Sequence, residues 1–314
     1  MSVRWRLAAA GLIIVALMVL VVVGSRGNDP IATPTPSPIA IASVPAFDHI
    51  YVIVFENEES GSVIGSQKAP YINQLSRSFG LATNYDAVDH PSQPNYVALW
   101  SGSTQGVKDD RVHRIDAVTL GDQLEASGKS WMVYAQNLPI GGSASEPLCY
   151  TGATASGGPD GDGTYARKHN PAVSFVDVSN DAARCAAHMS DFNHFDPAAA
   201  NLELIVPNLC NDMHDCGVTA GDAWLKSWLP DHLLNTLTWQ STNNAVFITW
   251  DEGSSNAGGG GNVATIVISK NTPAGYVSDV PHTHYSLLRT IEEAWGIDCL
   301  KYSCEANTLG EFFK

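Results

Sequence analysis

Acidic and amide side chains follow two strongly apolar segments of the chain. Glu56 and Asn57 come directly after HIYVIVF, and Asp251 and Glu252 come directly after AVFITW. Their carboxylate and carbonyl oxygens suit Mg²⁺, Ca²⁺ or Mn²⁺, and Zn²⁺ as a borderline case. Taken singly, each pair is compatible with a surface loop. Because adjacent acids at a buried strand end repel one another unless a cation lies between them, both pairs together predict a divalent-metal site.

A serine stands between two prolines in the segment HPSQPNYVALWSG, residues 90–102. One interpretation is that Ser92 or Gln93 merely begins a helix, since Pro94 is tolerated in a first helical turn. The other is that Ser92 is a nucleophile, because a helix N-terminus favours phosphate and lowers the cost of a serine alkoxide. A metal-bound serine needs no histidine base, and Asn95 adds an amide nearby. The chain lacks the G-x-S-x-G motif of lipases.

Three histidines are candidates for stabilising charge or protonating a leaving group: His169, His214 and His284. His214 has an aspartate on either side that could orient its ring, although a single such histidine is more often structural. His169 follows a lysine, and this pair could contact an anion. VPHTHYS holds two histidines, at positions 282 and 284, and only one is expected to face the site. We favour His284, which abuts the last helical pattern.

Short apolar segments typical of buried strands alternate with helical patterns from residue 47 onward. The expected strands are residues 49–55, 130–135, 202–207, 245–250 and 262–269. The expected helices are residues 71–79, 95–102, 121–128, 221–237 and 284–296. This alternation predicts an α/β fold with a mostly parallel central sheet and helices on both faces.

The polar residues after three of these strands should meet at one edge of the sheet. Ligands in open parallel sheets bind beyond the carboxyl ends of the strands. The segments in question are ENEES, NLCNDMHDC and DEGSS, which follow residues 49–55, 202–207 and 245–250. A long Gly- and Pro-rich insertion, residues 139–180, is expected to act as a lid or loop cap over this edge.

The N-terminal part is expected to direct export. Two arginines precede an uncharged apolar run, residues 7–24, which favours a cytoplasmic N-terminus with the remainder outside the cytoplasm. The run is longer than a signal-peptide core of about 7–15 residues and just long enough to span a bilayer. Residues 1–26 are therefore a cleaved signal peptide or a membrane anchor. Residues 27–46, rich in Pro, Thr and Ser, are an expected linker, and residues 47–314 the catalytic domain.

Charge and cysteine content narrow the class of protein further. The chain has 17 Lys+Arg against 32 Asp+Glu, and this net charge of −15 argues against nucleic-acid binding. Six cysteines in an exported domain predict three disulfides. Proximity favours the pairs Cys210 with Cys216, Cys299 with Cys304, and Cys149 with Cys185, although sequence alone does not decide the connectivity.

Six motifs, taken in order, resemble the bacterial phosphoesterase family of secreted acid phosphatases and phospholipases C, within the alkaline-phosphatase superfamily. The motifs are IVFENEES, HPSQPNYVALWSG, RKHNP, PNLCNDMHDC, WDEG and HTHYSLL, and they cover about residues 47–297. SQPNY is similar to the [S/T]-x-P-N nucleophile motif of that superfamily. The resemblance implies an alkaline-phosphatase-like fold in which Ser92 attacks phosphorus and forms a phosphoserine that water releases.

The resemblance also assigns roles by position. The metal ligands would be Glu56, Asn57, Ser92, Asp251 and Glu252. Asn95 would hold a phosphoryl oxygen, and the three candidate histidines would stabilise charge or protonate the leaving group. The number and identity of the divalent ions, Mg, Ca, Mn or Zn, stay open because members of the superfamily differ.

The chain departs from the phospholipases C of this family. Those enzymes usually read MMENRSFDH after the first strand and carry DEHGG, whereas FENEES and DEGSS stand here in a short chain. This departure favours an exported, metal-dependent phosphomonoesterase that acts on phosphoinositides or other small phosphate esters. A phospholipase C or phosphodiesterase of the same fold, which would also take a phospholipid headgroup, is the alternative. A non-catalytic cation-binding module is a third hypothesis, since acidic loops often bind cations without catalysis.

Overall fold

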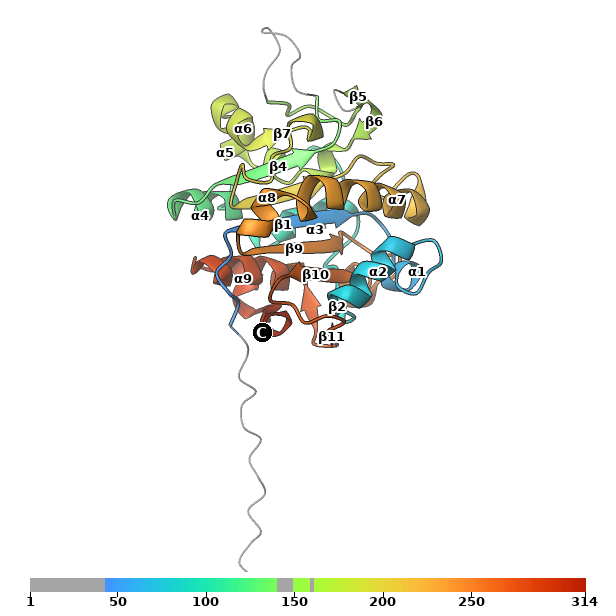
Figure 1. Cartoon of the computed structure of the whole chain (residues 1–314). Coiled ribbons are helices and arrows are strands. Elements are labelled where there is room, and N and C mark those ends of the chain that lie inside the picture. Colours follow the sequence, from blue (N-terminus) through green and yellow to red (C-terminus); the bar gives the residue numbers. More distant parts are fainter. Residues whose placement is uncertain (1–42, 140–148, 159–160) are drawn as a thin grey trace, which may run out of the picture. The chain divides into compact units, whose positions relative to one another are not determined.

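The computed structural model describes residues 43–139, 149–158 and 161–314 (Figure 1). The expected signal peptide or anchor, residues 1–26, and nearly all of the expected linker, residues 27–46, lie outside the described residues. Across the three described stretches, every helix is too short or too polar to cross a bilayer.

Eight strands form the central sheet, in the order β11-β2-β10-β9-β1-β8-β4-β7 (Figure 1). Their bounds are β1 His49–Phe55, β2 Gly80–Ala82, β4 Trp131–Ala135, β7 Met189–Ser190, β8 Leu202–Val206, β9 Asn244–Trp250, β10 Thr265–Ser269 and β11 Val277–Ser278. All neighbours pair in parallel except at β10, which is antiparallel to both β9 and β2. The predicted mostly parallel sheet is confirmed.

Four further strands form two small ribbons. β3 (Tyr85–Asp86) pairs in parallel with β12 (His282–Thr283), and β5 (Ala155–Gly158) pairs antiparallel with β6 (Gly161–Tyr165). The β5–β6 ribbon lies within the expected insertion, residues 139–180. Each ribbon strand is short or Gly-rich, so none carries the apolar pattern that identifies a strand in a sequence.

Four of the five expected helices are present with shifted bounds, as α2, α3, α4 and α9. The α-helices are α1 Ser60–Val63, α2 Pro70–Ser78, α3 Ser92–Ser101, α4 Leu120–Ala126, α5 Val176–Ser179, α6 Ala182–His188, α7 Gly217–Leu229, α8 Leu237–Ser241 and α9 His284–Trp295. The expected helix over residues 221–237 is α-helical only as far as Leu229 and ends at Leu234. A π-helical turn, Pro230–Leu234, separates α7 from α8 there, because Pro230 has no N–H to continue the α-helical hydrogen-bond ladder.

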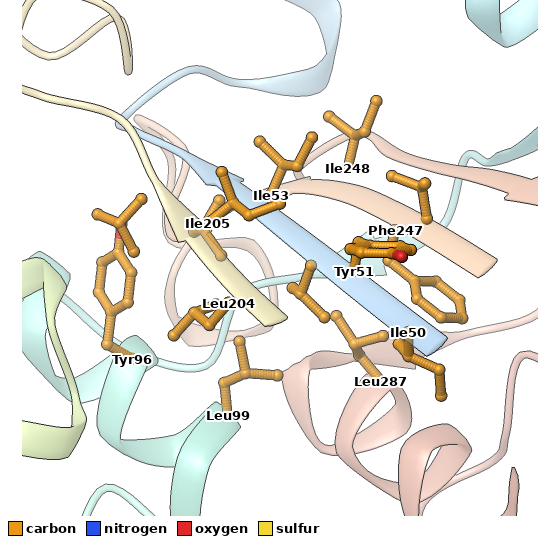
Figure 2. Packing of buried hydrophobic residues seen from close by; sticks show 14 of the residues in the cluster. Ile50, Tyr51, Ile53, Tyr96, Leu99, Leu204, Ile205, Phe247, Ile248 and Leu287 are labelled. Atoms are coloured by element: carbon orange, nitrogen blue, oxygen red, sulfur yellow. The ribbon is translucent and has the colours of Figure 1, made fainter. Parts of the chain in front are cut away.

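Both faces of the sheet are buried, which explains why β1 reads as a continuous apolar run. Figure 2 shows Leu204 of β8 lying toward Leu99 of α3 and Leu287 of α9 on one face. On the other face, Phe55 of β1 packs against Trp224 of α7, with ring centroids 5.8 Å apart. Accordingly, α3 contacts α9 and α2 contacts α7, one pair on each side.

Three disulfides close loops of the described chain, in the expected pairing: Cys149–Cys185, Cys210–Cys216 and Cys299–Cys304. Disulfides form and persist in oxidising compartments. The Cys210–Cys216 bridge closes the segment that follows β8, and the Cys149–Cys185 bridge ties the insertion to α6.

Candidate active site

The ends of three neighbouring strands meet as predicted. β1 lies between β8 and β9 and is parallel to both, so Glu56, the segment after Val206 and Asp251 share one edge of the sheet. The Glu56 N–H donates to the Asp212 carbonyl at 2.9 Å. The Asn57 N–H donates to Asp251 Oδ1 at 3.1 Å. These two hydrogen bonds connect the end of β1 with the segment after β8 and with the end of β9.

The Ser92 hydroxyl points into this cluster. α3 begins at Ser92, and the residue before it, Pro91, has no side chain that caps the helix. Ser92 Oγ lies 3.1 Å from Glu56 Oε2 and 3.1 Å from Glu252 Oε1, and the residue is buried. Because a hydroxyl has one proton, it donates to only one of these carboxylates at a time. The interpretation of Ser92 as a mere helix start does not explain this geometry.

Burial perturbs the acids of the cluster. It raises the pKa of Glu56 to about 8 and that of Asp212 to about 7. Burial also raises the pKa of Asp251 well above its usual range, and the negative charges of Glu56 and Glu252 add to the rise. Glu56 and Asp251 therefore retain protons at neutral pH, and Asp212 retains a proton in about half of the molecules, unless a cation replaces the protons.

Several buried atoms of the cluster fit a divalent cation. Glu56, His169 and Asp212 each offer one ligand atom, and these atoms lie within 4.8 Å of one another. The ring nitrogens of His169 lie 3.0 Å from Glu56 Oε2 and 3.3 Å from Asp212 Oδ2, yet neither contact has hydrogen-bond geometry. Asn57 Oδ1 and Asp251 Oδ2 are also buried without a hydrogen-bond partner. The donor set is compatible with a divalent metal whose identity it does not specify.

Lys168, which the sequence suggested only as a possible anion contact beside His169, reaches the nucleophile from the insertion. It lies in the short 3₁₀ turn Arg167–His169, which follows β6. Its Nζ is 3.4 Å from Ser92 Oγ, 3.1 Å from Asp110 Oδ2 and 3.4 Å from His214 Nε2. The turn therefore brings a cation and a buried imidazole to the sheet edge together.

His214 is half-buried at the edge of the cluster. Its Nδ1 is 2.7 Å from Asp215 Oδ1, and its Nε2 faces Lys168. Because an ammonium group only donates, Nε2 accepts there and Nδ1 carries the proton given to Asp215. The flanking aspartate thus orients this ring, as the sequence suggested.

Neither His284 nor Asn95 forms a hydrogen bond with Ser92. His284 Nε2 donates to the Asp251 carbonyl at 2.6 Å, and its Nδ1 accepts from the Tyr85 hydroxyl at 3.2 Å. Burial lowers the pKa of His284 to about 4, so its ring is neutral at neutral pH. The Asn95 amide makes four hydrogen bonds to the backbone of residues 88–91. In this structure, both side chains position the loops that carry the acids and the serine.

Two more residues that the sequence did not single out complete the cluster. His90 Nδ1 forms a hydrogen bond with the Glu252 carboxylate, and His90 Nε2 lies at hydrogen-bond distance, 2.8 Å, from the Ser255 carbonyl. Tyr96, one turn after Ser92 on α3, donates to Glu56 Oε1. Both residues lie within HPSQPNYVALWSG. Only their short distance from Ser92 along the sequence could have suggested that they belong to the site.

Known proteins share this sequence pattern. The phosphoesterase family profile matches residues 55–298. A phosphatidylinositol-3-phosphatase of Mycobacterium tuberculosis is 31% identical over 274 residues, which cover 85% of this chain and 83% of that protein. An acid phosphatase of Aspergillus fumigatus is 28% identical, and a phosphate-repressible acid phosphatase of Penicillium chrysogenum is 30% identical. The match covers 87% of this chain in both cases but only 60% and 65% of the fungal proteins, less than two thirds of their length.

Solved structures share the fold. A phosphonate monoester hydrolase from Silicibacter pomeroyi has a TM-score of 0.52 at 11% identity, over 85% of this chain and 76% of that one. A protein of the alkaline phosphatase superfamily from Vibrio parahaemolyticus has a TM-score of 0.51 at 11% identity, over 83% and 72%. At such low identity the likeness concerns the fold alone, an α/β fold that this chain shares with those two proteins. The profile match and the relatives together show that the chain belongs to the phosphoesterase family of phosphoric ester hydrolases.

Proposed function

We propose that this chain is an exported, metal-dependent phosphomonoesterase in which Ser92 is the nucleophile. The observation that carries the proposal is the position of Ser92 Oγ, 3.1 Å from both Glu56 and Glu252 at the N-terminus of a buried helix. Export is supported by the three disulfides and by the apolar run near the N-terminus.

Each residue of the cluster has a definable part in hydrolysis of a phosphomonoester. Ser92 loses its proton to a neighbouring carboxylate as its oxygen attacks phosphorus, the bond to the leaving alcohol breaks, and a phosphoserine results. The Lys168 ammonium stabilises negative charge on the phosphoryl oxygens. A divalent ion held by Glu56, Asp212 and His169, with Asn57, Asp251 and Glu252 alongside, would favour the ionised serine and neutralise phosphoryl charge.

His214 is placed to act on the leaving group. Asp215 orients its ring, and its Nε2 lies next to Lys168, which also contacts Ser92. Once protonated, Nε2 can donate to the departing alkoxide, and it can then accept a proton from the water that hydrolyses the phosphoserine. His284 keeps the Asp251 backbone in place and stays neutral throughout.

The substrates we infer are small phosphate esters, with phosphoinositide headgroups among them. This inference rests on the relatives named phosphatidylinositol-3-phosphatase and acid phosphatase. A phosphodiesterase or phospholipase C remains the alternative, because the same nucleophile also attacks diesters.

A comparison of two substrates tests the proposal. We expect the wild type to release phosphate from p-nitrophenyl phosphate, but not to cleave bis-p-nitrophenyl phosphate. Ser92→Ala should lower turnover by about three or more orders of magnitude, as removal of a nucleophile does elsewhere, without a large change in Tm. Ser101→Ala is the matched control, since the Ser101 hydroxyl lies on the same helix and bonds the Val97 carbonyl. Retention of more than a tenth of the activity by Ser92→Ala would rule out the proposed nucleophile.

A further inference from the structure

A cavity of about 300 Å³ adjoins the proposed nucleophile. It lies between the loop that carries Asp110, Arg111 and Val112 and the segment that carries Arg167 and Lys168. Lys168 connects the cavity with the proposed nucleophile, because it lines the cavity and its Nζ is 3.4 Å from Ser92 Oγ. A substrate whose phosphate lies at Ser92 would therefore have this cavity as a neighbour.

Arg167 is a buried cation whose partners are all neutral. It is only 5% exposed. Its guanidinium donates to the Thr151 carbonyl at 3.3 Å, the Val173 carbonyl at 2.8 Å and Ser174 Oγ at 3.4 Å. No ion pair joins it to a carboxylate of the described residues. Burial lowers the pKa of Arg167, as expected for a desolvated cation. An anion in the cavity would offset the cost of burying this charge.

Other charges around the cavity are mostly positive. Arg114 is close enough to Arg167 for its charge to act on the Arg167 pKa. Arg111 is largely exposed, with Asp109 as its partner. Asp110, an acid in the cavity wall, already accepts the Gln93 N–H at 3.0 Å and Lys168 Nζ at 3.1 Å. This cationic patch is notable in a chain of net charge −15.

We propose that this cavity binds a second phosphate group of the substrate through Arg167 and Arg111, while the phosphate that is cleaved lies at Ser92. The inference rests on the proposed function and adds a substrate class, namely phosphomonoesters whose alcohol portion carries another phosphate. Guanidinium groups suit this ligand because their paired N–H groups match two phosphate oxygens. Val112, 60% exposed beside Arg111, adds an apolar surface at the rim.

A matched series of substrates tests this subsite. The substrates are the monophosphates and bisphosphates of linear alkanediols with three to six carbons, so that the spacing between phosphates varies. For at least one length, we expect kcat/KM of the wild type to be about tenfold higher for the bisphosphate, mainly through KM. Arg111→Gln and Arg167→Met should each lower this ratio toward one. Arg111→Gln suffices if the buried substitution does not fold, and Arg77→Gln, on the exposed side of α2, is the control.

The outcomes separate the two proposals. If the wild type hydrolyses the monophosphates but shows no preference at any length, or if neither arginine substitution alters the preference, the second-phosphate subsite is wrong and the proposed function stands. If no phosphomonoester is hydrolysed, both are wrong.

Two further substrates identify where the second phosphate comes from. They are glycerophosphoinositol 3-phosphate in solution and phosphatidylinositol 3-phosphate in phosphatidylcholine vesicles. If Arg111→Gln lowers kcat/KM equally for these two substrates, the result supports binding of the phosphodiester of a lipid headgroup. If Arg111→Gln lowers kcat/KM only for the alkanediol bisphosphates, the result supports free phosphate esters as the ligands.

Discussion

Glu203 offers a test of the fold that is independent of any bound metal. It lies on β8, in the sheet interior, and is fully buried. One carboxyl oxygen accepts the Ala200 N–H at 3.3 Å, and the other has no partner. Burial raises the pKa of Glu203 to about 9, and the Asp196 charge adds to the rise. The folded protein therefore keeps a proton on Glu203 that the unfolded chain releases.

The size and sign of the effect follow from this pKa. Because the folded pKa is the higher one, the stability that Glu203 contributes is complete below the unfolded value of 4.5 and is lost as pH rises to about 9. One pKa unit corresponds to about 1.4 kcal/mol, so the loss reaches roughly 3 kcal/mol at pH 7 and about 6 kcal/mol above pH 9. Glu203→Gln has nearly the same size and does not titrate.

Urea unfolding at pH 5, 7 and 8.5 measures this difference. The free energy of unfolding of Glu203→Gln, minus that of the wild type, should increase by roughly 3 kcal/mol between pH 5 and pH 7 and further by pH 8.5. Glu305→Gln removes an exposed carboxylate, and for this control the difference should be flat. A difference for Glu203→Gln that does not vary with pH would refute the reasoning.

Three other predictions concern the site and the disulfides. Lys168→Gln should lower kcat/KM about 10²- to 10³-fold toward p-nitrophenyl phosphate, because a charge that stabilises the phosphoryl oxygens is lost; an unchanged kcat/KM would exclude that role. Removal of divalent metal with EDTA should abolish hydrolysis and lower Tm, because the buried carboxylates then lose their counter-charge, and metal titration should restore both; full activity after dialysis against EDTA would contradict metal dependence. Replacing both Cys149 and Cys185 with Ala should lower the free energy of unfolding by about 4 kcal/mol. The same replacement of Cys299 and Cys304 should lower it by about 2 kcal/mol. The first loss is larger because the first disulfide joins residues 36 positions apart and the second joins residues 5 positions apart. Equal losses in denaturant titrations would count against a loop-entropy origin.

The sheet edge was predictable from the sequence because strands buried on both faces leave a clear pattern. β1 and β9 are strongly apolar along most of their length, and each is followed directly by an ionisable residue, Glu56 or Asp251. The carboxyl ends of parallel neighbours must share an edge, so the meeting of these acids follows from topology. Ser92 could be chosen as a candidate nucleophile because the prolines at positions 91 and 94 mark the start of a helix there.

Contacts between distant segments were not predictable in the same way. Lys168 and His169 reach the site from an insertion whose Gly-rich ribbon has no hydrophobic periodicity. The contact between His90 and Glu252 joins residues 162 positions apart. Asn95 was expected to hold a phosphoryl oxygen, but whether its amide bonds a substrate or the backbone of residues 88–91 depends on the local path of the chain. Such details are set by tertiary packing, and a single sequence carries no periodic signal for them.

The most direct test of the proposed chemistry is to trap the phosphoryl group on the enzyme. The wild type would be mixed with excess p-nitrophenyl phosphate, quenched in acid during the first turnovers, digested and analysed by peptide mass spectrometry. We predict phosphate on Ser92 in the peptide that contains QPNY, and none there in Ser92→Ala. Turnover with phosphate absent from Ser92, or present on another residue, would contradict the assignment of this serine as the nucleophile.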